Sequence, residues 1–231
     1  MKSLSNLLFG LFCAGVSLAP GQEDDIPLGI EAVAGFRSDY VYRGFDLAQT
    51  TMDFQVETEL VISDALSLGA GGWVATQLDD GFNERTGFID LYANVLDGVT
   101  IGASGVYRAY DHDILKSGLD LTASLIWHPA SDWSISAEVS RDFPSAGWYG
   151  ELSGQWSRRL SDDAYLGMAM GISATDDYYG HSGLNDFNGR ISLTYNINSM
   201  VSVTPFAGWS HELTTRDGDE LYRSEEHTSE L

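Results

Sequence analysis

Cysteine is almost absent from this 231-residue sequence, since its single cysteine, Cys13, lies in an apolar amino-terminal segment. Disulfides and thiol chemistry are therefore not expected in the rest of the chain. Basic residues are also scarce, and the formal net charge of −22 excludes nucleic acid as a partner, because phosphate binding requires a basic face. No apolar run after residue 22 approaches about 18 residues, so no transmembrane helix is predicted.

The first 22 residues have the composition of a secretory signal peptide. Lys2 precedes an apolar run from Leu7 to Val16, and small residues follow around Ala19. Cleavage is expected near Ala19 or Gln22. An exported chain without cysteine, whose apolar residues are scattered, is either a soluble β protein or an outer-membrane barrel.

Period-two alternation dominates the sequence downstream and is typical of strands with two unlike faces. In the segment 119–127, Leu, Ala and Trp residues share one face, while Asp120, Thr122 and Ser124 share the other. Eleven strands are predicted, most of them long enough to cross a bilayer when tilted. Their predicted ranges are 30–44, 51–62, 66–76, 87–95, 99–110, 119–127, 133–140, 148–156, 164–174, 187–196 and 201–212.

The predicted connections alternate in length along the chain. Those after even-numbered strands are short, whereas those after odd-numbered strands are longer and acidic, as in residues 77–84, 111–113 and 175–181. This sorting is typical of outer-membrane barrels, with the short turns in the periplasm. We therefore predict an all-β, up-and-down antiparallel transmembrane β-barrel that occupies residues 23–222.

Aromatic residues on the apolar faces gather near the ends of the predicted strands. Two girdles at the membrane interfaces are expected from them, although a soluble protein could use the same residues in its core. The girdle residues are Trp127, Trp133, Trp156 and Tyr195 near short turns, and Tyr107, Trp148 and Trp209 near long loops.

Eleven strands are an odd number, whereas closed bacterial barrels formed by one chain have an even number. A twelfth, carboxyl-terminal strand is therefore expected after about Tyr222 and is missing from this sequence. In its place stand residues 223–231, which read RSEEHTSEL. This tail resembles a translated frame of a widely used sequencing adapter and is interpreted as non-native, with an acidic extracellular tail as the alternative.

The stretch "GFRSDYVYRG" from Gly35 to Gly44 carries a family resemblance. It resembles the start of a family of uncharacterised bacterial exported proteins with an amino-terminal S-D-Y-x-x-R-G motif. The matching residues are Ser38, Asp39, Tyr40, Arg43 and Gly44, and the likeness extends loosely through "FIDLYANV" at 88–95. The resemblance implies an outer-membrane barrel and no established activity.

Charged side chains on the polar faces are predicted to line the lumen. We expect Arg37 and Arg43 to pair with Asp53, Glu57 or Glu59 on the next strand, either to brace the barrel or to form a constriction. The predicted lumen and selectivity residues are Arg37, Asp39, Arg43, Asp53, Glu57, Glu59, Asp90, Arg108, Asp120, Glu138, Glu151 and Arg190.

The function expected from this pattern is porin-like passage of small hydrophilic solutes across the outer membrane, with cations preferred. The alternative is a non-conducting structural or surface-binding protein that acts through its acidic loops, for which Phe82, Tyr178 and Tyr179 are candidate contacts. No convergent nucleophile and base suggests an enzyme, because Ser210 and His211 face opposite sides of a strand. The loop carboxylates lack the spacing of a dedicated calcium site, so neither metal nor cofactor is expected.

Overall fold

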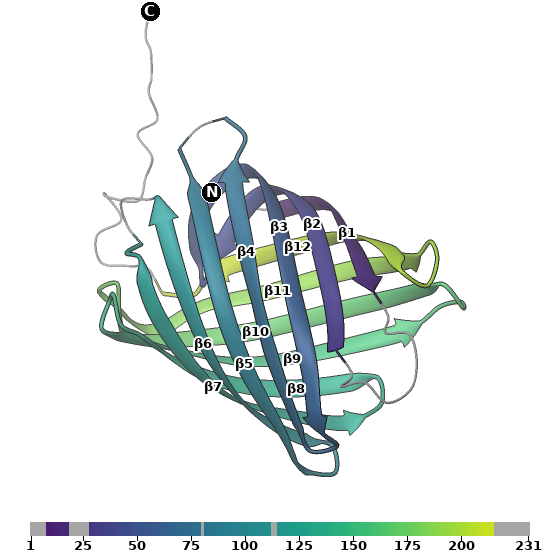
Figure 1. Cartoon of the computed structure of the whole chain (residues 1–231). Helices are drawn as coiled ribbons and strands as arrows, with labels where there is room; N and C mark the ends of the chain where they lie inside the picture. Colours follow the sequence, from purple (N-terminus) through teal and green to yellow (C-terminus); the bar gives the residue numbers. More distant parts are fainter. Residues whose placement is uncertain (1–7, 19–27, 80, 112–114, 215–231) are drawn as a thin grey trace, which may run out of the picture.

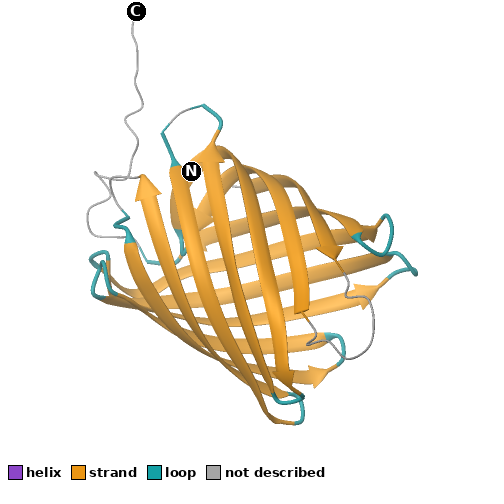
Figure 2. Cartoon of the chain, in the orientation of Figure 1, coloured by secondary structure: helices purple, strands orange, loops and turns teal. Residues whose placement is uncertain are grey.

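Antiparallel strands follow one another around a closed barrel in the computed structural model, which describes residues 8–18, 28–79, 81–111 and 115–214 (Figure 1). Within these ranges there are twelve strands and only short loops between them (Figure 2). The strands are β1 (Leu8–Leu18), β2 (Leu28–Tyr42), β3 (Phe45–Ser63), β4 (Leu66–Gln77), β5 (Asn83–Leu96), β6 (Val99–Asp111), β7 (Gly118–Ala130), β8 (Trp133–Asp142), β9 (Gly147–Arg159), β10 (Ala164–Tyr178), β11 (His181–Asn196) and β12 (Val201–Glu212). No helix in the described part of the chain is long and apolar enough to cross a membrane.

All eleven strands predicted between residues 30 and 212 are confirmed, and so is the all-β antiparallel barrel. The alternation of faces explains the closure. On β3, the apolar side chains of Met52, Phe54 and Val56 are 41–51% exposed on the outside, whereas Thr51 and Asp53 on the other face are buried. The strand thus places an apolar face outward and a polar face inward, as in a transmembrane barrel.

Strand β1 closes the barrel between β2 and β12. Leu8 pairs with Gly208 near the end of β12, and Leu18 pairs with Ile30 near the start of β2. This course gives β1 the position and direction expected for the missing twelfth strand, although the segment belongs to the predicted signal peptide. The physical reason is that an open edge between β2 and β12 would leave two rows of backbone hydrogen-bonding groups without partners.

The two ends of the barrel differ. The turn end carries the connections after β3, β5, β7, β9 and β11, and all are short, as predicted. The hairpin end carries those after β2, β4, β6, β8 and β10. Two connections predicted here as long loops are instead two-residue turns, Arg43-Gly44 and Tyr179-Gly180, because β3, β10 and β11 extend into the predicted loops. The prediction of uniformly long loops at this end was therefore wrong.

Several sequence predictions concern residues outside the described ranges. These are the tail 223–231, the predicted return segment beyond residue 214, the loop residues His112 and Asp113, and most of the signal peptide outside β1.

We expect the mature protein to begin near residue 20 or 23, as the signal-peptide composition predicts. Intact mass spectrometry of protein extracted from an outer-membrane fraction would locate the first residue. A mature chain that retains residues 8–18 would contradict this prediction and would identify β1 as the native closing strand.

Candidate functional site

The β2–β3 hairpin bends over the lumen at the hairpin end of the barrel. Its turn has positive φ angles at Arg43 (49°) and Gly44 (78°), as a two-residue type I′ turn requires. Tyr40 pairs with Ala48 but Val41 pairs with Asp46, so Leu47 is an extra residue on β3. Such a β-bulge bends a strand and increases its twist. The bulge thus accounts for the inward course of the hairpin tip.

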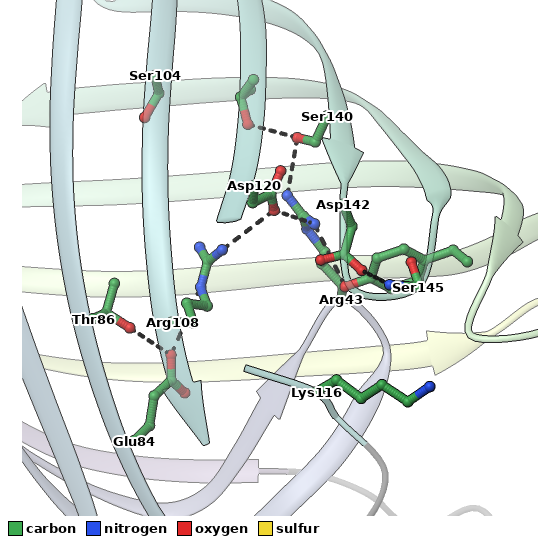
Figure 3. Close-up of polar contacts among 12 residues, drawn as sticks. Arg43, Glu84, Thr86, Ser104, Arg108, Lys116, Asp120, Ser140, Asp142 and Ser145 are labelled. Atoms are coloured by element: carbon green, nitrogen blue, oxygen red, sulfur yellow. Dashed lines mark hydrogen bonds and ion pairs between the residues drawn. The ribbon is translucent and has the colours of Figure 1, made fainter. Parts of the chain in front are cut away.

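Arg43 at the tip reaches the opposite wall of the barrel. Its guanidinium binds Asp120 Oδ2 on β7 at 2.7 Å and Ser140 Oγ on β8 at 2.9 Å (Figure 3). Its carbonyl oxygen accepts a hydrogen bond from Asn185 Nδ2 on β11 at 3.0 Å. In a ring of twelve strands, β8 lies opposite β2. The hairpin therefore spans the lumen and is anchored on its far side.

Three tyrosine rings surround the same guanidinium. The Arg43 Cζ atom lies 4.4 Å from the ring centre of Tyr149, 5.2 Å from that of Tyr42 and 5.6 Å from that of Tyr178. Only 9% of the Arg43 side chain is exposed. A desolvated guanidinium gains from ring quadrupoles and from a buried carboxylate together, which offsets its loss of water. We call Asp120, Ser140, Tyr42, Tyr149 and Tyr178 the Arg43 cage.

A second arginine shares the Asp120 carboxylate. Arg108 on β6 lies 3.2 Å from Asp120 Oδ2 and 3.7 Å from Glu84 Oε1, and its Cζ atom lies 4.7 Å from the Tyr42 ring (Figure 3). Glu84 in turn accepts hydrogen bonds from the hydroxyls of Tyr40 at 2.9 Å and Thr86 at 2.8 Å. Both arginines, Arg43 and Arg108, are therefore paired with buried carboxylates.

An apolar cluster covers the hairpin above these charges. Its members are at most 7% exposed, and they are Tyr40, Phe45, Leu47, Ala48, Ala75, Phe82, Leu115, Tyr149 and Tyr178. The Phe45 ring lies 5.9 Å from that of Tyr178 and 6.0 Å from that of Tyr179, in edge-on geometry. Burial raises the pKa of Tyr179 in the β10–β11 turn, so its hydroxyl stays protonated. The cluster packs the hairpin as a globular core would, inside the mouth of the barrel.

Below the hairpin, the lumen contains a cavity of about 570 Å³, which we call the hairpin-side cavity. Its charged lining residues come from six strands and from the β2–β3 turn. They are Arg37, Asp39, Arg43, Asp90, Arg108, Glu138, Glu151, Asp186 and Arg190. A small solute of several heavy atoms fits this volume, and most of the residues that line it have polar or charged side chains.

A second cavity of about 360 Å³ lies toward the turn end and is called the turn-side cavity. Glu31, Glu57 and Glu59 line it, together with Asp90 and Tyr92, which also line the hairpin-side cavity. Glu31 and Glu57 are direct cross-strand partners, which places like charges side by side. No ion pair involves these three glutamates in the described ranges, so this part of the lumen is strongly acidic.

The structure places all twelve predicted lumen residues inside the barrel. Eight line the hairpin-side cavity, Glu57 and Glu59 line the turn-side cavity, and the buried Asp53 and Asp120 bind arginines. The predicted pairing of Arg37 with Asp53 is confirmed at 2.7 Å. The predicted pairing of Arg43 with the neighbouring strand was wrong, because the bent hairpin carries Arg43 across to Asp120.

The predicted girdle residues lie near the strand ends at the two rims. Tyr107, Trp127, Trp133, Trp148 and Tyr195 are 45–55% exposed. Trp156 is less exposed and donates a hydrogen bond from Nε1 to Asp132 Oδ2 at 3.2 Å, while Trp209 packs over Gly189 on β11. These positions agree with two aromatic bands, whose contact with membrane interfaces stays a prediction.

Sequence reasoning missed several members of the Arg43 cage and its surroundings. Tyr149 and Tyr178 come from strands on the far side of the barrel, and Ser140 and Glu84 carried no distinguishing pattern. The available signal was the tyrosine content of segments predicted as exposed loops. Among the described residues, no group of three or more His, Cys, Asp or Glu side chains is arranged to hold a metal ion.

No protein-family model and no curated protein matches the chain. Among solved structures, it is similar to the KdgM porin in complex with disordered oligogalacturonate, at a TM-score of 0.43 and 11% identity over 88% of this chain and 99% of that one. It is also similar to an outer-membrane channel from Pseudomonas putida F1, at a TM-score of 0.41 and 10% identity over 90% of this chain and 97% of that one. A mutant Rh. blastica porin has a TM-score of 0.31 and 8% identity over 89% of this chain and 99% of that one. At TM-scores this low, the fold is assigned from the strand pairing of the chain itself.

Replacing Phe45 with Ala should loosen the hairpin, because Phe45 is 3% exposed and packs against Tyr178 and Tyr179. We expect a loss of about 3 kcal/mol in the free energy of unfolding, measured by urea titration in detergent. Phe143→Ala is the matched control, since Phe143 is 54% exposed at the same end of the barrel. Equal losses in the two variants would contradict the packing described for the hairpin.

Proposed function

We propose that the chain forms an outer-membrane barrel that passes small hydrophilic solutes and prefers cations. The observation that carries this proposal is the polar, net acidic lumen of a closed barrel, with cavities large enough to hold a solute. A barrel that served only as a scaffold would gain stability from apolar side chains in this space, because unpaired buried carboxylates are costly.

The outer face of the barrel supports membrane insertion. Leu, Ile, Val, Met and Phe side chains on nearly every described strand are about 40–60% exposed there, and they include Phe54, Ile89, Leu121, Leu152 and Met170. Water would penalise this continuous apolar surface, whereas hydrocarbon would not. Together with the predicted signal peptide, this surface favours the outer membrane as the location.

The cation preference follows from the distribution of paired and unpaired charges. Arg37, Arg43 and Arg108 bind carboxylates at the hairpin end. Within the described ranges, no ion pair forms at the remaining carboxylates that line the two cavities, which are Glu31, Asp39, Glu57, Glu59, Asp90, Glu138, Glu151 and Asp186. A solute moving between the rims therefore meets a net negative potential, which attracts cations and repels anions.

The hairpin restricts what can pass. It anchors on the far wall and buries an apolar cluster in the mouth, so passage is limited to small solutes or requires the hairpin to move. The same packing favours the second candidate, a barrel that does not conduct. Surface binding through aromatic loop residues is less favoured, because Phe82 and Tyr178 are each 2% exposed and belong to the cluster.

Single-channel recording in a planar bilayer with a salt gradient tests the proposal. We expect discrete current steps with a reversal potential on the cation-selective side. A barrel that is folded by its circular dichroism, yet gives no current, would overturn solute passage and leave the non-conducting barrel.

The double variant Glu57→Gln, Glu59→Gln should reduce the cation preference. A unit charge about 8 Å from a passing ion in water attracts a cation and repels an anion by about 0.5 kcal/mol each, so each substitution should lower the cation-to-anion permeability ratio roughly five-fold. Reversal potentials in a salt gradient measure this ratio. The matched control is Asp64→Asn, Asp97→Asn, which removes two carboxylates from turns outside the lumen. An unchanged ratio in the first variant would remove the two glutamates from the selectivity site.

A further inference from the structure

The Arg43 cage is a cation site that the chain fills with its own side chain. We propose that this cage is selective for guanidinium and small alkylammonium groups, so that a free solute of this class binds Asp120 when the Arg43 side chain leaves it. The inference deepens the proposed function, since such a solute would reach the cage through the lumen, and it names a chemical class of ligand.

The geometry of the cage is that of a guanidinium receptor. Asp120 and Ser140 accept hydrogen bonds from two different nitrogens of the same planar group, at 2.7 and 2.9 Å. The ring of Tyr149 lies 4.4 Å from the central carbon, within the range of a cation–π contact. None of these contacts uses the alkyl stem of Arg43, so they recognise the guanidinium itself.

Two buried polar atoms at the cage have no hydrogen-bond partner among the described residues. They are Asp120 Oδ1 and the hydroxyl oxygen of Tyr42. Asp120 is only 2% exposed, and buried carboxylate oxygens without donors are uncommon and costly. Arg43 contacts Asp120 through Oδ2 alone, which it shares with Arg108. An untethered guanidinium has the freedom to bind both oxygens, in the bidentate geometry that this pair favours.

One side of the cage borders the lumen, whereas Asp120 and Ser140 are buried behind it. Arg43, Tyr42 and Tyr149 all line the hairpin-side cavity, where Glu138 and Glu151 face each other as cross-strand partners. These carboxylates have no arginine partner in the described ranges and raise the local concentration of cations. A cationic solute in the cavity is therefore adjacent to the cage.

Because a solute and Arg43 compete for Asp120, solute binding would be coupled to the position of the hairpin in the mouth of the barrel. Arg43 is held near Asp120 by the hairpin, so its effective concentration is high and a weak ligand does not displace it. Removal of the Arg43 side chain leaves the cage vacant and lets the free ligand bind.

The test uses Arg43→Ala barrels and methylguanidinium as the probe. We expect Arg43→Ala to lower the melting temperature in detergent, and methylguanidinium chloride to raise it again with half-saturation on the order of millimolar. Sodium chloride at equal ionic strength and urea, which is planar but uncharged, should have no such effect. The wild-type melting temperature should not respond over the same range.

Two variants define where the probe binds. The double variant Arg43→Ala, Asp120→Asn should not be stabilised by methylguanidinium. If this variant does not fold, the double variant Arg43→Ala, Tyr149→Leu replaces it and should likewise show no stabilisation. Arg190→Ala removes a lumen arginine outside the cage and should show no response. Equal stabilisation by sodium chloride or urea, or a response that persists without Asp120, would overturn the proposal.

Folding of the test variant is also decisive. Arg43→Gln replaces Arg43→Ala if the latter does not fold, because it keeps part of the side-chain length. Failure of both variants to fold, even when methylguanidinium is present during refolding, would overturn the inference, since the free ligand would then be unable to replace Arg43.

The melting temperature is measured without recording a current, so the test of this inference is independent of the test of the proposed function. If the barrel gives no current but its Arg43→Ala variant binds methylguanidinium, the cage is a ligand site and the proposal of solute passage is rejected. If the barrel conducts but the Arg43→Ala variant does not respond to methylguanidinium, solute passage is supported and the ligand site is rejected.

Discussion

Closure of the backbone hydrogen-bond ladder is the constraint on which the rest of the structure depends. In hydrocarbon no water can satisfy a strand edge, so every described strand must have two neighbours. The ring of twelve strands meets this requirement with β1 between β2 and β12. Closure also fixes the alternation of side chains, because each residue then faces either lipid or lumen. Apolar residues cover the outside, and all charges carried by the polar faces are directed into a narrow interior.

Charges confined in this way must either find partners or remain close to water. Both outcomes occur in the same lumen. At the hairpin end, Asp120 receives two arginines, and Glu84 is bound by Arg108 and by hydroxyl donors. At the turn end, Glu31, Glu57 and Glu59 line an open cavity and have no arginine partner among the described residues. The interior thus changes along the barrel axis, from a region with buried ion pairs at the hairpin end to an acidic region at the turn end.

Local patterns in the sequence were sufficient for the barrel and for the contents of its lumen. Period-two alternation located all eleven strands after residue 28, and the inward faces correctly contained the twelve charged residues. The bent hairpin could not be predicted, because it depends on one extra residue, Leu47, and on contacts between strands far apart in the chain. Polar residues after Gly44 therefore suggested a loop, and Arg43 was assigned to a neighbouring strand rather than to the opposite wall.

The bulge at Leu47 links the backbone to the chemistry of the lumen. Without an extra residue on β3, the hairpin would continue along the wall, and Arg43 would lie beside its neighbouring strands. The bend instead exposes the tip to the far wall, where a buried Asp120 requires a cation and tyrosines can surround it. An ion pair is weak as a source of stability, because desolvation offsets most of its attraction. Its value here is positional, since only a cation of the right shape at the tip satisfies Asp120 and holds the hairpin across the mouth.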